Sequence, residues 1–139
     1  KMNRRDSRKK LVTDAREAID VCAGVNVRLA ARRISRFLEE RLKETDLSLA
    51  QFGLMIHIAA ATDDTISALV ARTGLDQSTL SRNLQALEKR GLVETAIVEQ
   101  DLRRRAVWLT ESGARRLEEA MPAWKQAHAE LSTVIDPVL

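Results

Sequence analysis

Gly74 separates two short segments whose apolar residues recur at helical spacing, and this arrangement constrains the fold more than any other feature of the chain. Thr65 can cap a helix before the glycine, and Asp76 can cap a second helix that Gly91 ends. The apolar residues of these two helices are Ile66, Leu69 and Val70, then Leu80, Leu84 and Leu87. Because glycine readily adopts the positive φ of a tight turn, the pattern predicts a helix-turn-helix.

A β-hairpin is expected directly after the second helix. Residues 92–98 and 105–109 are rich in Val, Ile, Leu and Trp, and they flank the polar stretch 99–104. Two such runs around a polar connection are typical of a two-stranded hairpin with a charged tip. A hairpin that follows a helix-turn-helix forms the wing of a winged helix.

Long helices are expected on both sides of this winged helix. Thr13 can cap a helix over residues 13–43, which would span roughly 45 Å and is longer than the core of one small domain needs. Residues 111–135, capped by Thr110, show the narrow seam of alternating three- and four-residue spacings that is typical of helix pairing. Pro122 is expected to kink or restart this last helix, because proline lacks the backbone N–H. The seam consists of Ala114, Leu117, Met121, Trp124, His128, Leu131 and Ile135.

These elements predict a mainly α chain with a small β wing, a winged helix-turn-helix that dimerises through long N- and C-terminal helices. Residues 48–110 would form the winged helix, beginning with a helix capped by Ser48. Residues 13–45 and 111–139 would form the dimerisation helices, so that residues 13–139 make one domain. Residues 1–12 are basic and lack apolar periodicity, so we expect a disordered tail that either contacts phosphates or serves no binding role.

The second helix of the predicted helix-turn-helix carries side chains suited to reading DNA bases. A helix that enters the major groove uses its first turns, which therefore need short hydrogen-bonding side chains. The candidates are Gln77, Ser78, Thr79, Ser81 and Arg82. Arg82 can reach a guanine edge or a phosphate. The alternative is a helical hairpin whose polar face is simply solvated.

Three consecutive arginines, Arg103, Arg104 and Arg105, lie at or beside the predicted wing tip. Arginines on a wing can enter the narrow minor groove, where the potential of DNA is most negative. A solvated turn is the alternative reading of this triplet. Its position directly after a reading helix favours contact with DNA.

The charge of the whole chain is weak evidence for such a partner. The formal net charge is +3, but six Lys or Arg residues against one Asp fall within the first ten residues. The remainder is therefore slightly acidic. Within it, only the stretch 72–105, which holds the reading helix and the wing, has an excess of basic residues. The location of the basic residues, and not the net charge of the chain, is consistent with a nucleic-acid partner.

The chain resembles the MarR family of transcriptional regulators over roughly residues 13–135. The first matching positions are Leu49, Gln51 and Phe52. They are followed by Ser78, Thr79, Leu80, Ser81, Arg82, Leu84, Leu87, Glu88, Arg90, Gly91, Leu92 and Val93. The most specific run is Asp101, Arg103, Val107, Leu109, Thr110 and Gly113.

This resemblance implies several further features of the protein. Asp101 would brace the wing by pairing with Arg103. The protein would be a homodimer with interlocking terminal helices, and a cleft between its dimer and DNA-binding parts would take a small phenolic or aromatic effector. A dimer would place two reading helices about 34–36 Å apart on a pseudopalindromic operator.

The remaining reactive residues point to no catalytic or metal site. Cys22 lies on the apolar stripe of the first helix and is expected to be buried and structural; a redox-sensing role is the alternative. His57 and His128 are expected in the core or an interface, since their spacing fits no zinc site. We expect no enzyme activity, no cofactor and no membrane association. The single cysteine and the absence of a long apolar run suggest a cytoplasmic protein.

The sequence therefore predicts a sequence-specific DNA-binding transcriptional regulator, a repressor released by an unknown small molecule. The alternative is a helical dimerisation or adaptor protein whose winged helix binds protein. DNA binding that weakens with salt would separate the two.

Overall fold

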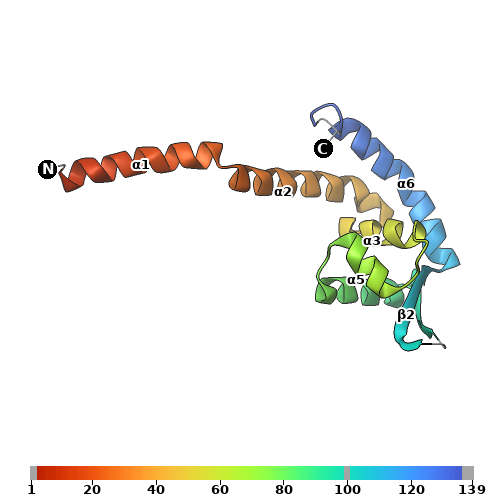
Figure 1. Cartoon of the computed structure of the whole chain (residues 1–139). Helices are drawn as coiled ribbons and strands as arrows, with labels where there is room; N and C mark the ends of the chain where they lie inside the picture. Colours follow the sequence, from red (N-terminus) through yellow and green to blue (C-terminus); the bar gives the residue numbers. More distant parts are fainter. Residues whose placement is uncertain (1–2, 99–100, 136–139) are drawn as a thin grey trace. The chain divides into compact units, whose positions relative to one another are not determined.

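The computed structural model describes residues 3–98 and 101–135, and of these it leaves the side chains of 98 and 101–103 undescribed. The chain is mainly helical with one two-stranded antiparallel sheet, as predicted (Figure 1). The elements in chain order are α1 (Arg4–Val21), α2 (Ala23–Leu42), the 3-10 turn η1 (Lys43–Thr45), α3 (Leu49–Ala59), α4 (Ile66–Thr73), α5 (Gln77–Lys89), β1 (Val93–Val98), β2 (Asp101–Leu109) and α6 (Glu111–Leu131). They form two compact units, residues 1–37 and 38–139.

The first unit corrects two expectations about the N-terminal region. The basic segment expected to be disordered is helical from Arg4, and Asn3 caps α1 by accepting from the backbone N–H of Arg5. Arg and Lys are good helix formers, so an apolar stripe is not needed for helical backbone. The single helix predicted over 13–43 is instead divided at Cys22, whose extended ψ of 105° ends α1. Cys22 is exposed in the single chain and not buried as expected.

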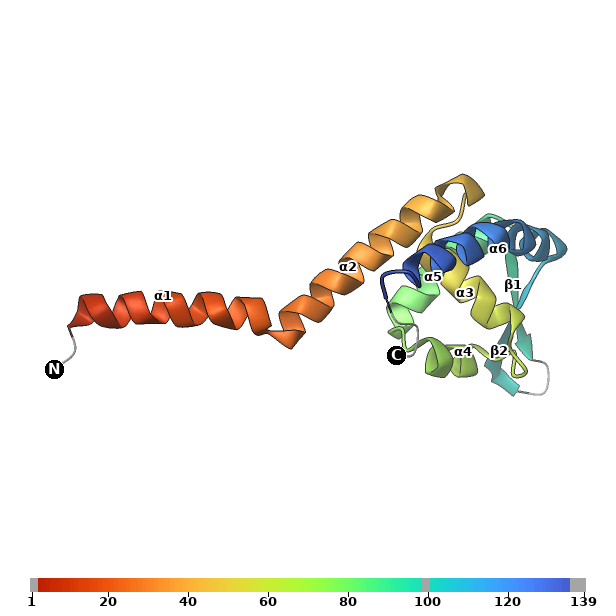
Figure 2. The ribbon, with the colours of Figure 1, turned by 90° about the horizontal axis from the view of Figure 1, so that it is seen from above.

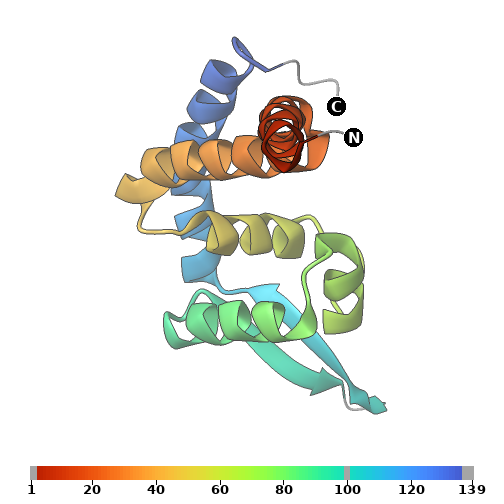
Figure 3. The same cartoon turned by 90° about the vertical axis from the view of Figure 1, so that its left-hand side faces the viewer.

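The second unit is organised around an apolar core shared by its helices and the hairpin. The largest fully buried side chains are Phe52, Leu42, Leu54, Met55, Leu69, Leu80, Leu87 and Val93. Burying one such side chain stabilises the fold by about 1.5–3 kcal/mol. Figures 2 and 3 show α3 between α6 and the α4–α5 pair, so the helix-turn-helix rests on α3.

Four of the five predicted helix caps are confirmed, and the fifth is wrong, because Thr13 lies inside α1. The side chains of Thr65, Asp76 and Thr110 each accept a hydrogen bond from the backbone N–H three residues later. Ser48 does the same and completes a reciprocal capping box with Gln51. Gly74 follows α4 with a φ of 64°, the left-handed conformation that the turn requires. The boundaries of α3, α4 and α5 thus follow from local side-chain chemistry.

The hairpin pairs Val93 with Leu109 and continues to Ile97 and Arg105, after which the register shifts. Its second strand begins at Asp101, four residues before the predicted start, so most of the expected polar tip is strand. The backbone N–H of Val107 also donates to the carbonyl of Asp64 (2.8 Å). The adjacent Thr65 forms an isolated antiparallel bridge with Ala106. The base of the wing is therefore fastened to the segment that precedes α4.

Helix α6 continues through Pro122. The sequence predicted either a kink or a restart at this proline, and the helix does not restart. Buried Leu117 and Ala120 precede the proline and buried Ala127 follows it, so packing on both sides compensates for one missing hydrogen bond. The expected dimer seam is also partly used within the chain. Trp124 packs on Phe52 of α3, with ring centroids 6.1 Å apart.

Gly113 provides a test of the packing between α6 and the hairpin. A Cβ at this position would lie 1.9 Å from the backbone oxygen of Leu92. Because a backbone atom cannot move aside cheaply, Gly113→Ala should lower the free energy of unfolding by about 1–3 kcal/mol. Urea denaturation followed by circular dichroism would measure the change.

Gly53→Ala is the matched control, since a Cβ at Gly53 in α3 meets no atom within 4 Å. Alanine is the better residue inside a helix, so this variant should gain about 0.5–1 kcal/mol. Equal stability of the two variants would contradict the packing described above.

Candidate nucleic-acid interface

One face of α5 is apolar and buried, and the opposite face is polar and exposed. Leu80, Leu84 and Leu87 are buried against the core. The exposed residues of the opposite face are Ser78, Ser81, Arg82 and Gln85, with Gln77 beside them at the N-terminus. Their spacing of three and four places them along one side of the helix. The structure thus brings together four of the five residues predicted to read DNA.

Sequence reasoning missed Gln85 as a member of this surface. It lies four residues after Ser81 and is exposed on the same side of α5. Glutamine can pair with adenine through two hydrogen bonds, so the side chain suits a groove-facing position. The signal was present in the sequence, because Gln85 continues the polar spacing by one further helical turn.

The N-terminal cap of α5 engages two of the predicted base-reading hydroxyls. The hydroxyl of Ser78 donates to Oδ1 of Asp76 (2.6 Å), and that of Thr79 donates to Oδ2 (2.6 Å). The backbone N–H of Thr79 also donates to Oδ1 (2.9 Å). The Ser78 and Thr79 hydroxyls, followed by that backbone N–H, hold the pKa of the Asp76 carboxyl well below its usual range. Thr79 is only half-exposed, so its hydroxyl belongs to the cap more than to the outer face.

The wing lies alongside α5, and Arg105 faces the helix. Figure 3 shows the hairpin running beneath α5. A hollow of about 180 Å³ between them is lined by Gln77, Ser81, Gln85, Glu88, Thr95 and Arg105, together with Ile66 and Leu84. Arg105 therefore adds its charge to the polar side of α5. Arg105 was expected at or beside the wing tip, and it lies within β2, opposite Ile97.

Arg104 lies on the other side of the strand, beside the loop before α4. Its guanidinium nitrogen is 3.9 Å from Oδ1 of Asp63, with both side chains about half exposed. Arg72 also donates to the backbone oxygen of Asp63 (3.3 Å). Hydrogen bonds from the side chain and backbone N–H of Thr65, and then the charges of Arg104 and Arg72, lower the pKa of Asp63. Arg104 thus helps to fasten the wing.

The expected pairing of Asp101 with Arg103 stays a prediction, because both side chains lie outside those that the structure describes. The backbone of both residues belongs to β2.

A second charged cluster fixes the far end of α5. Arg90 donates to the carboxylate of Asp46 (2.9 Å), to its backbone oxygen (2.7 Å) and to Oε1 of Gln51 (3.0 Å). Arg116 of α6 reaches the same Asp46 carboxylate at 3.3 Å. Asp46 has a φ of 59°, which turns the chain from η1 toward α3. This cluster gives a structural reason for Gln51 and Arg90 in the motif.

The other reactive side chains form no catalytic or metal constellation in the described part of the chain. His128 stacks on Trp124 with ring centroids 3.9 Å apart. His57 borders a hollow of about 210 Å³ between α3 and the α4–α5 pair, together with Leu54, Thr79 and Asn83. Among the described residues, no group of three or more His, Cys, Asp or Glu could hold a metal ion. None of the described helices has the length and apolar character to cross a membrane.

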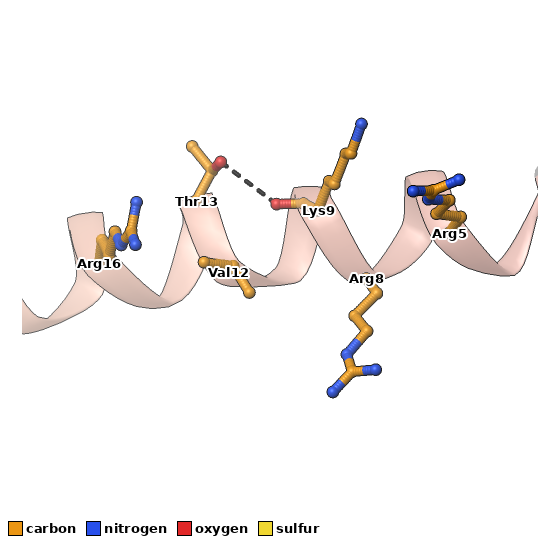
Figure 4. Close-up of a pocket in the computed structure, with 6 residues that line it drawn as sticks. All are labelled: Arg5, Arg8, Lys9, Val12, Thr13 and Arg16. Atoms are coloured by element: carbon orange, nitrogen blue, oxygen red, sulfur yellow. Dashed lines mark hydrogen bonds between the residues drawn. The ribbon is translucent and has the colours of Figure 1, made fainter.

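Helix α1 carries a basic surface of its own. Arg5, Arg8, Lys9 and Arg16 project from it around Val12 and Thr13, and the Thr13 hydroxyl donates to the backbone oxygen of Lys9 (Figure 4). These cations come from one exposed helix. The surface is therefore a charged flank and not an enclosed binding site.

The sequence model of the MarR family matches residues 45–104, the stretch from η1 to the wing. An HTH-type transcriptional regulator of Bacillus anthracis is 35% identical over 83 residues, which cover 60% of this chain and 54% of that protein. The transcriptional regulator MosR of M. tuberculosis, solved in complex with DNA, is 31% identical with a TM-score of 0.75, over 83% of this chain and 84% of MosR.

The chain belongs to the MarR family. A mutant MarR of E. coli solved with operator DNA has a TM-score of 0.78 at 26% identity. The match covers 86% of this chain and 86% of that protein. The E. coli regulator HosA is 36% identical over 77 residues, which is 55% of this chain and 57% of HosA. The chain thus matches about half the length of these curated relatives of this MarR-family protein.

The depressed pKa of Asp63 can be measured by NMR titration of its carboxyl carbon. The midpoint should fall below the ordinary value of 3.8. The stability that the charged Asp63 carboxylate contributes should therefore be fully present above pH 3.8. It should be lost as the pH falls through the lower pKa of the folded state.

Thr65→Val removes the hydroxyl, the largest cause, and should raise the midpoint toward 3.8. Thr65→Ser retains a hydroxyl and is the matched control. A wild-type midpoint at or above 3.8 would contradict the described geometry.

Proposed function

We propose that this MarR-family protein is a sequence-specific DNA-binding transcriptional regulator. The observation that carries the proposal is the exposed polar face of α5, where Ser81, Arg82 and Gln85 lie in consecutive turns beside Arg105. An α-helix fits the major groove, and Arg82 and Gln85 have the side chains that pair with guanine and adenine. The solved DNA complexes of MosR and MarR support this assignment.

In this proposal the wing and α5 act together. Arg105 approaches the DNA beside α5, and Arg103 lies further toward the end of the hairpin, where it suits the adjacent minor groove or backbone. Arg104 is directed to Asp63 and contributes to the position of the wing. The wing arginines therefore have different roles, although they are consecutive in sequence.

The proposal includes a homodimer on a pseudopalindromic operator. Several large apolar side chains of the first unit are exposed in the single chain: Leu11, Val12, Ile19, Val21, Val27 and Leu29. Exposed apolar surface on consecutive turns favours coverage by another chain. A second copy would also supply the second reading helix, about 34–36 Å from the first.

We also propose that the regulator represses transcription and is released by a small aromatic or phenolic effector. The resemblance to the family is the basis for this step. The hollow beside His57 is lined mainly by apolar groups, and Thr79 of α5 borders it. An effector there would lie against the helix that reads DNA. No catalytic role is assigned to the protein.

The experiment that tests the proposal is selection of genomic fragments by the purified protein, followed by binding assays across a salt series. Affinity for a selected fragment should fall with salt, with a logarithmic slope of about −0.9 per phosphate contacted. Failure to retain any fragment in a salt-dependent manner would overturn the proposal. Such a result would favour a protein-binding adaptor.

Arg82→Ala should cost about 1–3 kcal/mol of binding and relax the preference at one base position, if the arginine contacts a guanine. Fluorescence anisotropy with a selected duplex and its single-base variants measures both effects. Arg115→Ala is the matched control, since Arg115 is an exposed arginine of α6, away from α5 and the wing. Equal losses in the two variants would contradict the role of α5.

The wing arginines should differ in the same assay. Arg105→Ala should weaken binding to all sequences and lower the salt slope by about one phosphate contact. Arg104→Ala should leave the slope unchanged, because Arg104 contacts Asp63. A larger change in slope for Arg104→Ala than for Arg105→Ala would contradict the assigned roles.

A further inference from the structure

We infer that Asp76 and Ser78 are specificity-determining residues that select adenine or cytosine on the strand they face. The inference rests on the proposed DNA-binding function and concerns the direction of hydrogen bonds at the start of α5. Both residues are exposed, and both belong to the first turn of the helix proposed to enter the major groove. The chemistry of this turn differs from that of the rest of the surface.

The carboxylate of Asp76 determines the direction in which the neighbouring hydroxyls donate. An ionised carboxylate can only accept hydrogen bonds. Both its oxygens lie 2.6 Å from a hydroxyl, Oδ1 from Ser78 and Oδ2 from Thr79. Each hydroxyl hydrogen must therefore point toward Asp76. The lowered pKa of Asp76 is consistent with a charged carboxylate at neutral pH.

The outer side of this turn is consequently a surface of acceptors. A hydroxyl that has used its hydrogen presents only lone pairs to a ligand, and the carboxylate has lone pairs in addition. Phosphate oxygens, guanine O6 and N7, and thymine O4 are also acceptors and cannot pair with it. In the major groove, only the amino groups of adenine N6 and cytosine N4 donate. A base with an amino group is therefore the partner that this turn can accept.

The next turn of α5 presents the opposite chemistry. Arg82 carries only donors, and Arg105 of the wing adds further donors beside the same helix. Along α5, the exposed surface therefore presents hydrogen-bond acceptors in its first turn and hydrogen-bond donors in the next. Each half-site should therefore contain one position that prefers adenine or cytosine, distinct from the position that Arg82 reads.

Asp76→Asn tests the inference with little change in shape. Asparagine is as good an N-cap as aspartate, so its Oδ1 can still accept from the backbone N–H of Thr79 and the helix should form. Its amide NH₂ now donates where Oδ2 accepted. One amide hydrogen can bond the Thr79 hydroxyl oxygen that Oδ2 faced. The other is then free to donate to guanine or thymine, while Oδ1 keeps its hydrogen bond from Ser78.

The measurement is sequencing of duplexes selected from a random library by the full chain, with wild type and variant compared. Wild type should prefer adenine or cytosine at one position of each half-site, and Asp76→Asn should shift that position toward guanine or thymine by about tenfold. Glu119→Gln, which removes one negative charge from an exposed site on α6, should leave the preference unchanged. Circular dichroism would verify that the variants fold.

Two results would overturn the inference. The first is DNA binding by the wild type with no position that prefers adenine or cytosine beyond those read by Arg82 and Gln85. The second is tighter binding of Asp76→Asn to all sequences with unchanged preferences, which would mean that Asp76 acts only through its charge. In both results the protein still binds DNA, so the proposed function would stand. Absence of DNA binding by the wild type would overturn both.

Discussion

Backbone pairing between β2 and the segment before α4 is the constraint on which the proposed DNA surface depends. The hydrogen bond from Val107 to Asp64 and the bridge between Thr65 and Ala106 fasten the wing to the helix-turn-helix. Without them, the hairpin would be held to the rest of the winged helix only by its ends and by apolar packing of residues such as Val93 and Val107. With them, Arg105 is held beside α5, and Arg104 meets Asp63 at the same junction. The side chains proposed to contact DNA are thus positioned by backbone atoms.

The position of α5 itself is fixed at both ends by polar contacts and in the middle by apolar burial. Asp76 caps its N-terminus, and Arg90 joins its C-terminus to Asp46 and Gln51. Exposed ion pairs contribute little free energy individually, so burial of the three leucines provides most of the stability. The polar contacts instead fix the direction in which the outer face points. A reading helix needs this precision because a hydrogen bond to a base tolerates little displacement.

Much of the fold could be predicted because its signals are local. Ser48, Thr65, Asp76 and Thr110 each bond to a backbone group three residues away, so a cap is visible in a short window of sequence. The contacts of Arg90 with Asp46 and of Arg104 with Asp63 join residues about forty positions apart. No periodicity reveals such pairs, and the separate roles of Arg104 and Arg105 could not be foreseen. The helical N-terminal segment could not be predicted from apolar periodicity, because good helix formers such as Arg and Lys form helical backbone without an apolar stripe.

The central claim is that α5 and the wing form one surface that contacts DNA. The most direct test is amide chemical-shift mapping of the protein during titration with a duplex selected from genomic DNA. The account predicts that the largest changes fall in residues 76–85 and in the N-terminal half of β2, with small changes on the outer side of α6. Changes confined to α6 or to the first unit, with α5 unaffected, would contradict it.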